Sequence, residues 1–147
     1  MPVDYTSQLA AALAPEVLTR FERYVRIDTQ SSRDRTRSPS TPGQLELGAL
    51  LAGELRDAGL DDASLDDNGY VTATLESRQT DAPVVGLIAH IDTTPDAPGR
   101  GVEPIVHRDY AGETLTLPKL DTHLDPATMP TLATKRGHDI VLSLIHI

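Results

Sequence analysis

A histidine and an aspartate separated by one residue form the clearest chemical pattern in the sequence, at His90-Ile91-Asp92. They follow residues 84–89, a continuous apolar run that predicts a central strand buried on both faces. Because residues two apart in an extended chain point to the same side, His90 and Asp92 are expected to project together beyond the end of that strand. A neutral imidazole is a good zinc ligand, and a carboxylate can orient this or another metal-bound imidazole. The pattern alone indicates either one corner of a zinc site or an ordinary hydrogen-bonded histidine.

The same spacing occurs a second time, at His123-Leu124-Asp125. No apolar strand precedes this copy, so we predict that it lies in a loop. The remaining histidines stand in no comparable pattern: His107, His138 and His146. Four aspartates at 61, 62, 66 and 67 lack the spacing of a calcium loop, and we interpret them as a solvated turn.

Two stretches have the signals of helices. Apolar residues at helical spacing predict one or two helices within residues 7–26. The polar segment 29–41 is a predicted loop. A further helix should begin after Thr41, which can cap it, with Pro42 in the first helical position and Gly59 just past its end. Its buried face should consist of Leu45, Leu47, Leu50, Leu51 and Leu55.

Strand signals fill much of the remaining sequence. Residues 63–67 and 70–75 read as strands joined by a tight turn at Asn68-Gly69. Residues 95–130 are rich in Pro, Gly, Thr and Asp and predict a largely irregular region. Residues 139–147 look like a last strand. Helices followed by strands in this order favour an α/β or α+β domain.

The composition narrows the class of protein. The 39% of hydrophobic residues predicts a soluble globular chain whose core is aliphatic, since aromatic residues make up only 3%. A net charge of -9 argues against nucleic acid as a partner. The absence of cysteine excludes disulfides and thiolate ligands, so any metal must bind His and carboxylates. With no signal peptide or membrane-spanning run in the sequence, we expect a cytoplasmic protein without a membrane partner.

Four short motifs in order resemble the peptidase T family of the di-zinc aminopeptidase, carboxypeptidase and deacylase superfamily. The resemblance runs from about Leu18 to about Val141, and the Thr-Pro-Asp extension of the last motif distinguishes this family from the wider superfamily. The four motifs are Tyr24-Val25-Arg26-Ile27-Asp28-Thr29-Gln30-Ser31, Pro39-Ser40-Thr41-Pro42-Gly43-Gln44, Asp67-Asn68-Gly69-Tyr70-Val71 and His90-Ile91-Asp92-Thr93-Thr94-Pro95-Asp96.

The resemblance implies a three-layer α/β/α catalytic domain with a mixed central sheet, a smaller inserted lid or dimerisation domain, and a possible homodimer. It implies two zinc ions bridged by an aspartate and a water, a glutamate as general base, and release of the amino-terminal residue from small tripeptide substrates. By position, His90 would ligate one zinc. Asp92 would be the supporting catalytic carboxylate that orients a metal-ligating histidine.

The sequence departs from the family after residues 136–141. Family members continue there into a Gly-Ala-Asp-Asp stretch with the bridging aspartate, and their glutamate pair and last ligands lie farther on. We therefore expect residues 1–147 to be the amino-terminal part of the catalytic domain, without the inserted domain. Residues 1–13 would be an extra segment and residues 142–147 a non-native tail, so we assign no ligand role to His146.

Alternatives from other classes stay open. The chain by itself can be a non-catalytic fragment, because one imidazole cannot hold zinc firmly and catalytic sites use three protein ligands. It can also be a small binding module, although its last apolar strand would then be an exposed edge. A related di-zinc dipeptidase or deacylase is the nearest enzymatic alternative.

Overall fold

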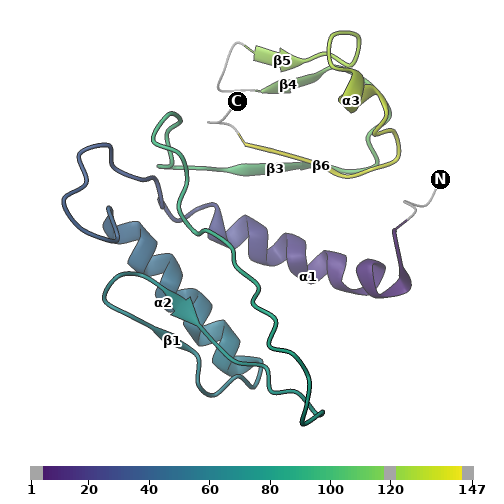
Figure 1. Cartoon of the computed structure of the whole chain (residues 1–147). Coiled ribbons are helices and arrows are strands. Elements are labelled where there is room, and N and C mark those ends of the chain that lie inside the picture. Colours follow the sequence, from purple (N-terminus) through teal and green to yellow (C-terminus); the bar gives the residue numbers. More distant parts are fainter. Residues whose placement is uncertain (1–4, 118–121, 144–147) are drawn as a thin grey trace. The chain divides into compact units, whose positions relative to one another are not determined.

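The computed structural model describes residues 5–117 and 122–143 and divides the chain into two compact units (Figure 1). We call residues 27–99 the central unit, and residues 1–26 with 100–147 the flanking unit. The described residues form three helices and three two-stranded antiparallel sheets. This mixture of helices and small sheets agrees in general with the predicted α/β class.

Helix α2, Pro42–Asp57, organises the central unit and has the ends that the sequence predicts. Thr41 is the N-cap in extended conformation and Pro42 occupies the first turn. At the other end, Gly59 has a φ of +90°, and its N–H donates to the Arg56 carbonyl at 2.8 Å. The Leu60 N–H donates to the Leu55 carbonyl at 3.0 Å, which completes a Schellman motif. Of the predicted apolar face, Leu47 is buried and the other four leucines are partly buried.

A short hairpin packs against α2, as Figure 1 shows for its first strand. Strands β1, Ser64–Leu65, and β2, Val71–Thr72, pair antiparallel. Asp66 closes the predicted turn, because its Oδ1 accepts from the backbone N–H groups of Asn68 and Tyr70 at 2.9 and 2.8 Å. The hairpin is thus confirmed, although its second strand is much shorter than the predicted 70–75. Asp66 also has the structural role in a turn that we expected of this acidic group.

The predicted central strand at residues 84–89 is not formed in this structure, so that expectation was wrong. These residues have no strand pairing, and Val84, Leu87 and Ile88 are 101%, 95% and 99% exposed. A strand buried on both faces needs neighbouring strands and covering helices. The described residues of the central unit offer one helix and one short hairpin, and neither pairs with this segment.

Helix α1, Gln8–Tyr24, confirms the predicted helix in residues 7–26 as one continuous element. Ser7 caps it by accepting a hydrogen bond from the Ala10 N–H at 3.0 Å. None of its residues, all of which the structure describes, is buried. Its apolar stripe is instead exposed: Leu9, Leu13, Val17 and Phe21.

The flanking unit also contains four strands and a short helix. Strand β3, Pro104–His107, pairs antiparallel with β6, Ile140–Ser143, and strand β4, Leu115–Leu117, pairs antiparallel with β5, Thr122–Leu124. Helix α3 spans Pro130–Ala133. A small core gathers between them, formed by Tyr110, Leu115 and Leu132 with Leu124, Ile140 and Leu142 around it.

This unit confirms one expectation and corrects another. The described residues of 95–130 are largely irregular, as predicted, although they also contain the short strands β3, β4 and β5. The second His-x-Asp copy is not in a loop, because His123 lies within β5 opposite Thr116. The predicted last strand is present as β6, which runs to Ser143 and pairs with β3 through Leu142 and Ser143. His146 and the rest of the proposed tail at 144–147 lie outside the described residues.

Asp139 joins the loop after β3 to the start of β6. Its Oδ1 accepts from the Asp109 N–H at 3.1 Å, and its Oδ2 accepts from the Arg108 guanidinium. Asp109 has a φ of +48°, an unusual conformation for a residue with a side chain. The Asp109 N–H, and next the Arg108 side chain, hold the pKa of the Asp139 carboxyl below its usual value. A carboxylate with a lowered pKa stabilises the fold above its ordinary pKa, and this contribution is lost as the pH falls through the lowered value.

We therefore expect Asp139→Asn to destabilise the chain at pH 7 and to have a smaller effect near pH 2, because the contribution of this charge is lost as the pH falls through the lowered pKa. The loss should stay within about 1 kcal/mol, because Asp139 is 38% exposed and exposed ion pairs contribute little. Urea unfolding at the two pH values measures it. Arg108→Gln should cost less, because the Asp109 N–H still binds the carboxylate. An equal loss at both pH values would show that the charge is not the cause.

Candidate active site

His90 and Asp92 contact one another directly. The His90 Nδ1 atom lies 2.8 Å from the Asp92 backbone oxygen and 3.2 Å from its Oδ1 atom. Both oxygens accept hydrogen bonds, so Nδ1 carries a proton, and in the neutral imidazole Nε2 then has the free lone pair. The imidazole is 85% exposed. This geometry gives the neutral tautomer that a metal-ligating histidine needs when it binds through Nε2.

Asp92 is held on its other side by Ser31. The Ser31 hydroxyl donates to Asp92 Oδ2 at 2.6 Å, a short hydrogen bond typical of an O–H donor and a charged acceptor. This hydroxyl is the largest cause that lowers the pKa of the Asp92 carboxyl, and His90 lowers it further, while partial burial opposes both. These contacts therefore favour the carboxylate form of Asp92.

Backbone pairing brings these residues together. The Ser31 N–H donates to the Thr93 carbonyl at 3.0 Å, and the Thr93 N–H donates to the Thr29 carbonyl at 3.2 Å. Gln30 and Thr93 thus form a parallel bridge between segments about sixty residues apart in the chain. His90 and Asp92 were predicted to project together from the end of a strand. They are positioned instead by this bridge, which lies directly after them in the chain.

A buried glutamine supports Ser31 from α2. Gln44 is 5% exposed, and its Nε2 atom lies 3.2 Å from the Thr29 carbonyl and 3.2 Å from the Ser31 hydroxyl. Its Oε1 atom accepts from the Ser40 N–H at 3.0 Å. Sequence reasoning assigned no role to Ser31 or Gln44. The only signal was their place in the first and second family motifs, since neither residue type stands out by chemistry alone.

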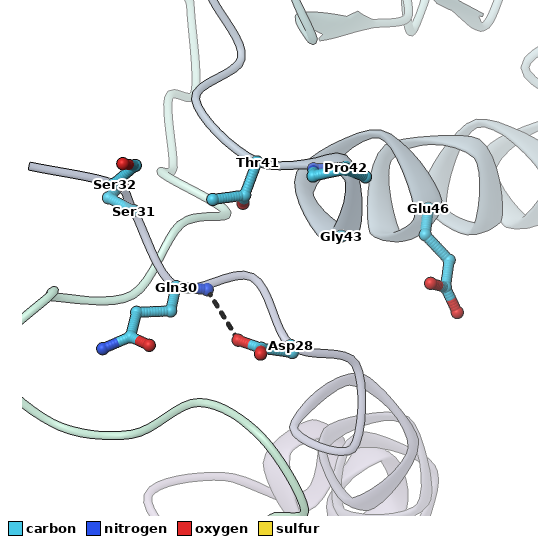
Figure 2. A pocket seen from close by; sticks show the side chains of 8 residues that line it. All are labelled: Asp28, Gln30, Ser31, Ser32, Thr41, Pro42, Gly43 and Glu46. Carbon is cyan, nitrogen blue, oxygen red and sulfur yellow. Dashed lines mark hydrogen bonds between the residues drawn. The ribbon is translucent and has the colours of Figure 1, made fainter. Parts of the chain in front are cut away.

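A cavity of about 520 Å³ lies beside this network, at the start of α2. Figure 2 shows Asp28 and Gln30 on the segment that precedes the helix, with the Gln30 N–H bonded to Asp28 Oδ1 at 3.2 Å. Ser31 belongs both to the cavity wall and to the contact with Asp92. The lining consists of Asp28, Gln30, Ser31, Ser32, Thr41, Pro42, Gly43 and Glu46.

The second His-x-Asp copy behaves differently. Asp125 uses its Oδ1 atom to accept from the Ala127 N–H at 2.8 Å, so its carboxylate closes the turn after β5. His90 and Asp92, by contrast, share a hydrogen bond. The two copies therefore differ in what surrounds them and not in spacing.

Among the described residues of this site, the exposed Nε2 atom of His90 is suited to bind a zinc ion. Within residues 5–117 and 122–143, no group of three or more His, Cys, Asp or Glu side chains is arranged to hold a metal. Catalytic zinc sites use three protein ligands. His90 as ligand and Asp92 as its supporting carboxylate therefore stay predictions.

The described part of the chain also contains no helix that is long and apolar enough to span a bilayer.

Several curated proteins that match most of this chain are named peptidase T. Peptidase T of Bacillus cereus (strain Q1) is 45% identical over 131 residues, which is 88% of this chain and 32% of the relative. Peptidase T of Bacillus thuringiensis (strain Al Hakam) and of Bacillus anthracis (strain A0248) are each 45% identical over 128 residues, 86% of this chain and 31% of the relative. No protein-family model matches the sequence.

These matches confirm the resemblance to peptidase T that the four motifs indicated. The chain spans about a third of the length of the curated relatives that it matches.

The cavity and the bridge depend on a close approach at the start of α2. A Cβ atom at Gly43 would lie 1.8 Å from the Asp28 carbonyl oxygen, far inside contact distance. Gly53, in the same helix, has open space around it. The absence of a side chain at Gly43 thus lets the segment that carries Thr29 and Ser31 lie against the helix.

We expect Gly43→Ala to lower the free energy of unfolding by about 1–3 kcal/mol, the usual cost of forcing an extra carbon into a packed site. Gly53→Ala is the matched control, and it should stabilise α2 by about 0.5–1 kcal/mol because alanine is the better helix former. Urea unfolding followed by circular dichroism measures both. If the two variants were equally stable, the close contact at Asp28 would be without energetic importance.

Proposed function

We propose that this chain is part of a zinc-dependent tripeptide aminopeptidase. The observation that carries the proposal is the 45% identity to proteins named peptidase T over most of the chain. The contact between His90 and Asp92 supports it, because it leaves Nε2 of an exposed imidazole free for a metal. Small peptides are the proposed substrates.

In this proposal His90 donates its Nε2 lone pair to one zinc, and Asp92 holds the ring through Nδ1–H. When bound, paired zinc ions would polarise the scissile carbonyl and lower the pKa of a bound water toward neutrality. Asp92, fixed by Ser31, would keep the imidazole in the ligating tautomer. By accepting a hydrogen bond from Nδ1–H it would also make Nε2 a more basic metal ligand. The general base and the other ligands would come from residues outside this chain.

The isolated 147-residue chain is accordingly proposed to be inactive. One imidazole supplies one of the three protein ligands that a catalytic zinc ion typically requires. We further propose a cytoplasmic location and a homodimer for the longer protein. Neither is needed for the assignment of His90.

A matched pair of variants tests the ligand assignment in the protein encoded by the extended reading frame. His90→Ala should lose one bound zinc and reduce kcat/KM for a tripeptide by more than the roughly 10–100-fold that loss of an outer-shell partner costs. His123→Ala has the same sequence spacing and should leave zinc content and turnover unchanged. Zinc content and tripeptide hydrolysis are measured on both.

Full zinc content in the His90→Ala protein would overturn the ligand role. Faster cleavage of dipeptides or of acylated amino acids than of tripeptides would favour the related dipeptidase or deacylase instead. The 147-residue chain serves as the inactive control, and tripeptide hydrolysis by it would contradict the proposed fragment.

We propose that the longer protein adopts the three-layer α/β/α domain. The exposed apolar segment at residues 84–88 supports this, because apolar surface of this kind is normally covered. In amide hydrogen exchange, Leu87 and Ile88 should exchange at unstructured rates in the 147-residue chain. In the longer protein their exchange should be slower by about a thousandfold or more, as in a core strand. Leu47 in α2 should be protected in both, and unprotected Leu87 in the longer protein would contradict the layered domain.

A further inference from the structure

The amide of Gln44 has a fixed orientation. Its Oε1 atom accepts from the Ser40 N–H at 3.0 Å, a group that can only donate. Its Nε2 atom donates to the Thr29 carbonyl at 3.2 Å, a group that can only accept. Exchanging the two ends of the amide would place donor against donor and acceptor against acceptor. The nitrogen of Gln44 therefore faces Ser31, and the buried site prevents water from replacing either bond.

The orientation of Gln44 decides the direction of the Ser31 hydroxyl. Nε2 of Gln44 lies 3.2 Å from the Ser31 Oγ atom and 3.2 Å from the Ser40 Oγ atom, and it can donate to these hydroxyl oxygens but accept from neither. The hydroxyl has one proton, and the Asp92 Oδ2 atom at 2.6 Å is an acceptor. The proton is thus directed at Asp92, because the Gln44 nitrogen cannot accept it.

The fixed orientation of the Asp92 carboxylate in turn determines its contact with His90. With Oδ2 held by Ser31, the carboxylate can present Oδ1 to the Nδ1 atom of His90 at 3.2 Å, next to the backbone oxygen at 2.8 Å. A carboxylate free to rotate would leave only the backbone oxygen to hold the proton on Nδ1. The chain of bonds runs in one direction, from Gln44 through Ser31 and Asp92 to His90, and all four residues belong to the central unit.

We propose that Ser31 and Gln44 are positioning residues that fix the Asp92 carboxylate and thereby keep the proton of His90 on Nδ1, with Nε2 free. The tautomer itself is a property of this chain. Its consequence for zinc binding rests on the proposed function.

The tautomer is measured on the 147-residue chain by nitrogen-15 NMR of the His90 ring, at a pH well above the ordinary imidazole pKa of about 6.5. In the wild type, the form protonated on Nδ1 should predominate. Ser31→Ala should lower the ratio of this form to the Nε2 form by at least about threefold, because a free imidazole favours the other nitrogen and the carboxylate no longer opposes it. Asp92→Asn should lower the ratio as much or more.

Rescue and control variants separate positioning from general damage. Ser31→Thr keeps the hydroxyl and should retain the wild-type ratio. Gln44→Met keeps the size of the side chain but removes its donor, and should shift the ratio in the direction of Ser31→Ala. Ser64→Ala removes a hydroxyl bonded only to Thr72 among the described contacts, at 3.2 Å, and should leave His90 unchanged. An unchanged His90 ratio in a folded Ser31→Ala chain would overturn the proposal.

Zinc binding to the longer protein is the second measurement. Ser31→Ala should weaken the Kd for one zinc by about 10–100-fold, the usual effect of losing an outer partner of a ligating histidine, while Ser31→Thr should not. A shifted tautomer together with unchanged zinc affinity would overturn its consequence for zinc but leave the positioning itself intact. A shifted tautomer in a protein without peptidase activity would contradict the proposed function alone. A normal His90 tautomer in Ser31→Ala, together with lost activity in His90→Ala, would contradict the positioning role of Ser31 and leave the proposed function intact.

Discussion

The buried amide of Gln44 is the interaction on which the arrangement of the candidate site depends. It connects the first turn of α2 to the Thr29 carbonyl, the Ser31 hydroxyl and the Ser40 backbone. A buried amide left without these partners would cost about 1–3 kcal/mol for each unsatisfied group. These hydrogen bonds therefore stabilise the position of the segment that carries Thr29 and Ser31 against α2. Gly43 makes the contact possible, since a side chain there would collide with the Asp28 carbonyl. The parallel bridge between Gln30 and Thr93 then fixes the position of Asp92, the residue before Thr93, relative to Ser31.

Local signals in the sequence were sufficient for the elements that depend on neighbours in the chain. Thr41, Pro42 and Gly59 gave the ends of α2, because capping and helix termination involve residues within a few positions. Asn68-Gly69 gave the hairpin turn for the same reason. The strand expected at 84–89 failed because burial on both faces requires distant partners, which an apolar run cannot reveal. The strands β3 to β5 were missed in a segment rich in Pro and Gly, where pairing between short strands outweighs weak local preference.

The site was predictable in part. The sequence placed His90 and Asp92 together, and the structure joins them by hydrogen bonds. They lie next to the bridge at Thr93 and do not project in parallel from the end of a strand. Ser31 and Gln44 could not be found by residue chemistry, because serine and glutamine acquire their roles here only through contacts between the segments at 29–31, 40–44 and 92–93. Such contacts depend on pairing across long sequence separations, which spacing does not encode.

The two His-x-Asp copies show that the hydrogen-bond partners of the aspartate, and not the sequence spacing, determine whether it contacts the histidine. In both, a carboxylate lies two residues after an imidazole. Asp125 accepts from a backbone N–H just after it and so stabilises a turn, whereas Asp92 is bonded by Ser31 on one oxygen and faces His90 with the other. A carboxylate already held by a hydroxyl can fix the proton position of an imidazole without losing entropy when a ligand arrives. Preorganisation of this kind is what a metal ligand needs, and the contacts of Asp92 would supply it for the role proposed for His90.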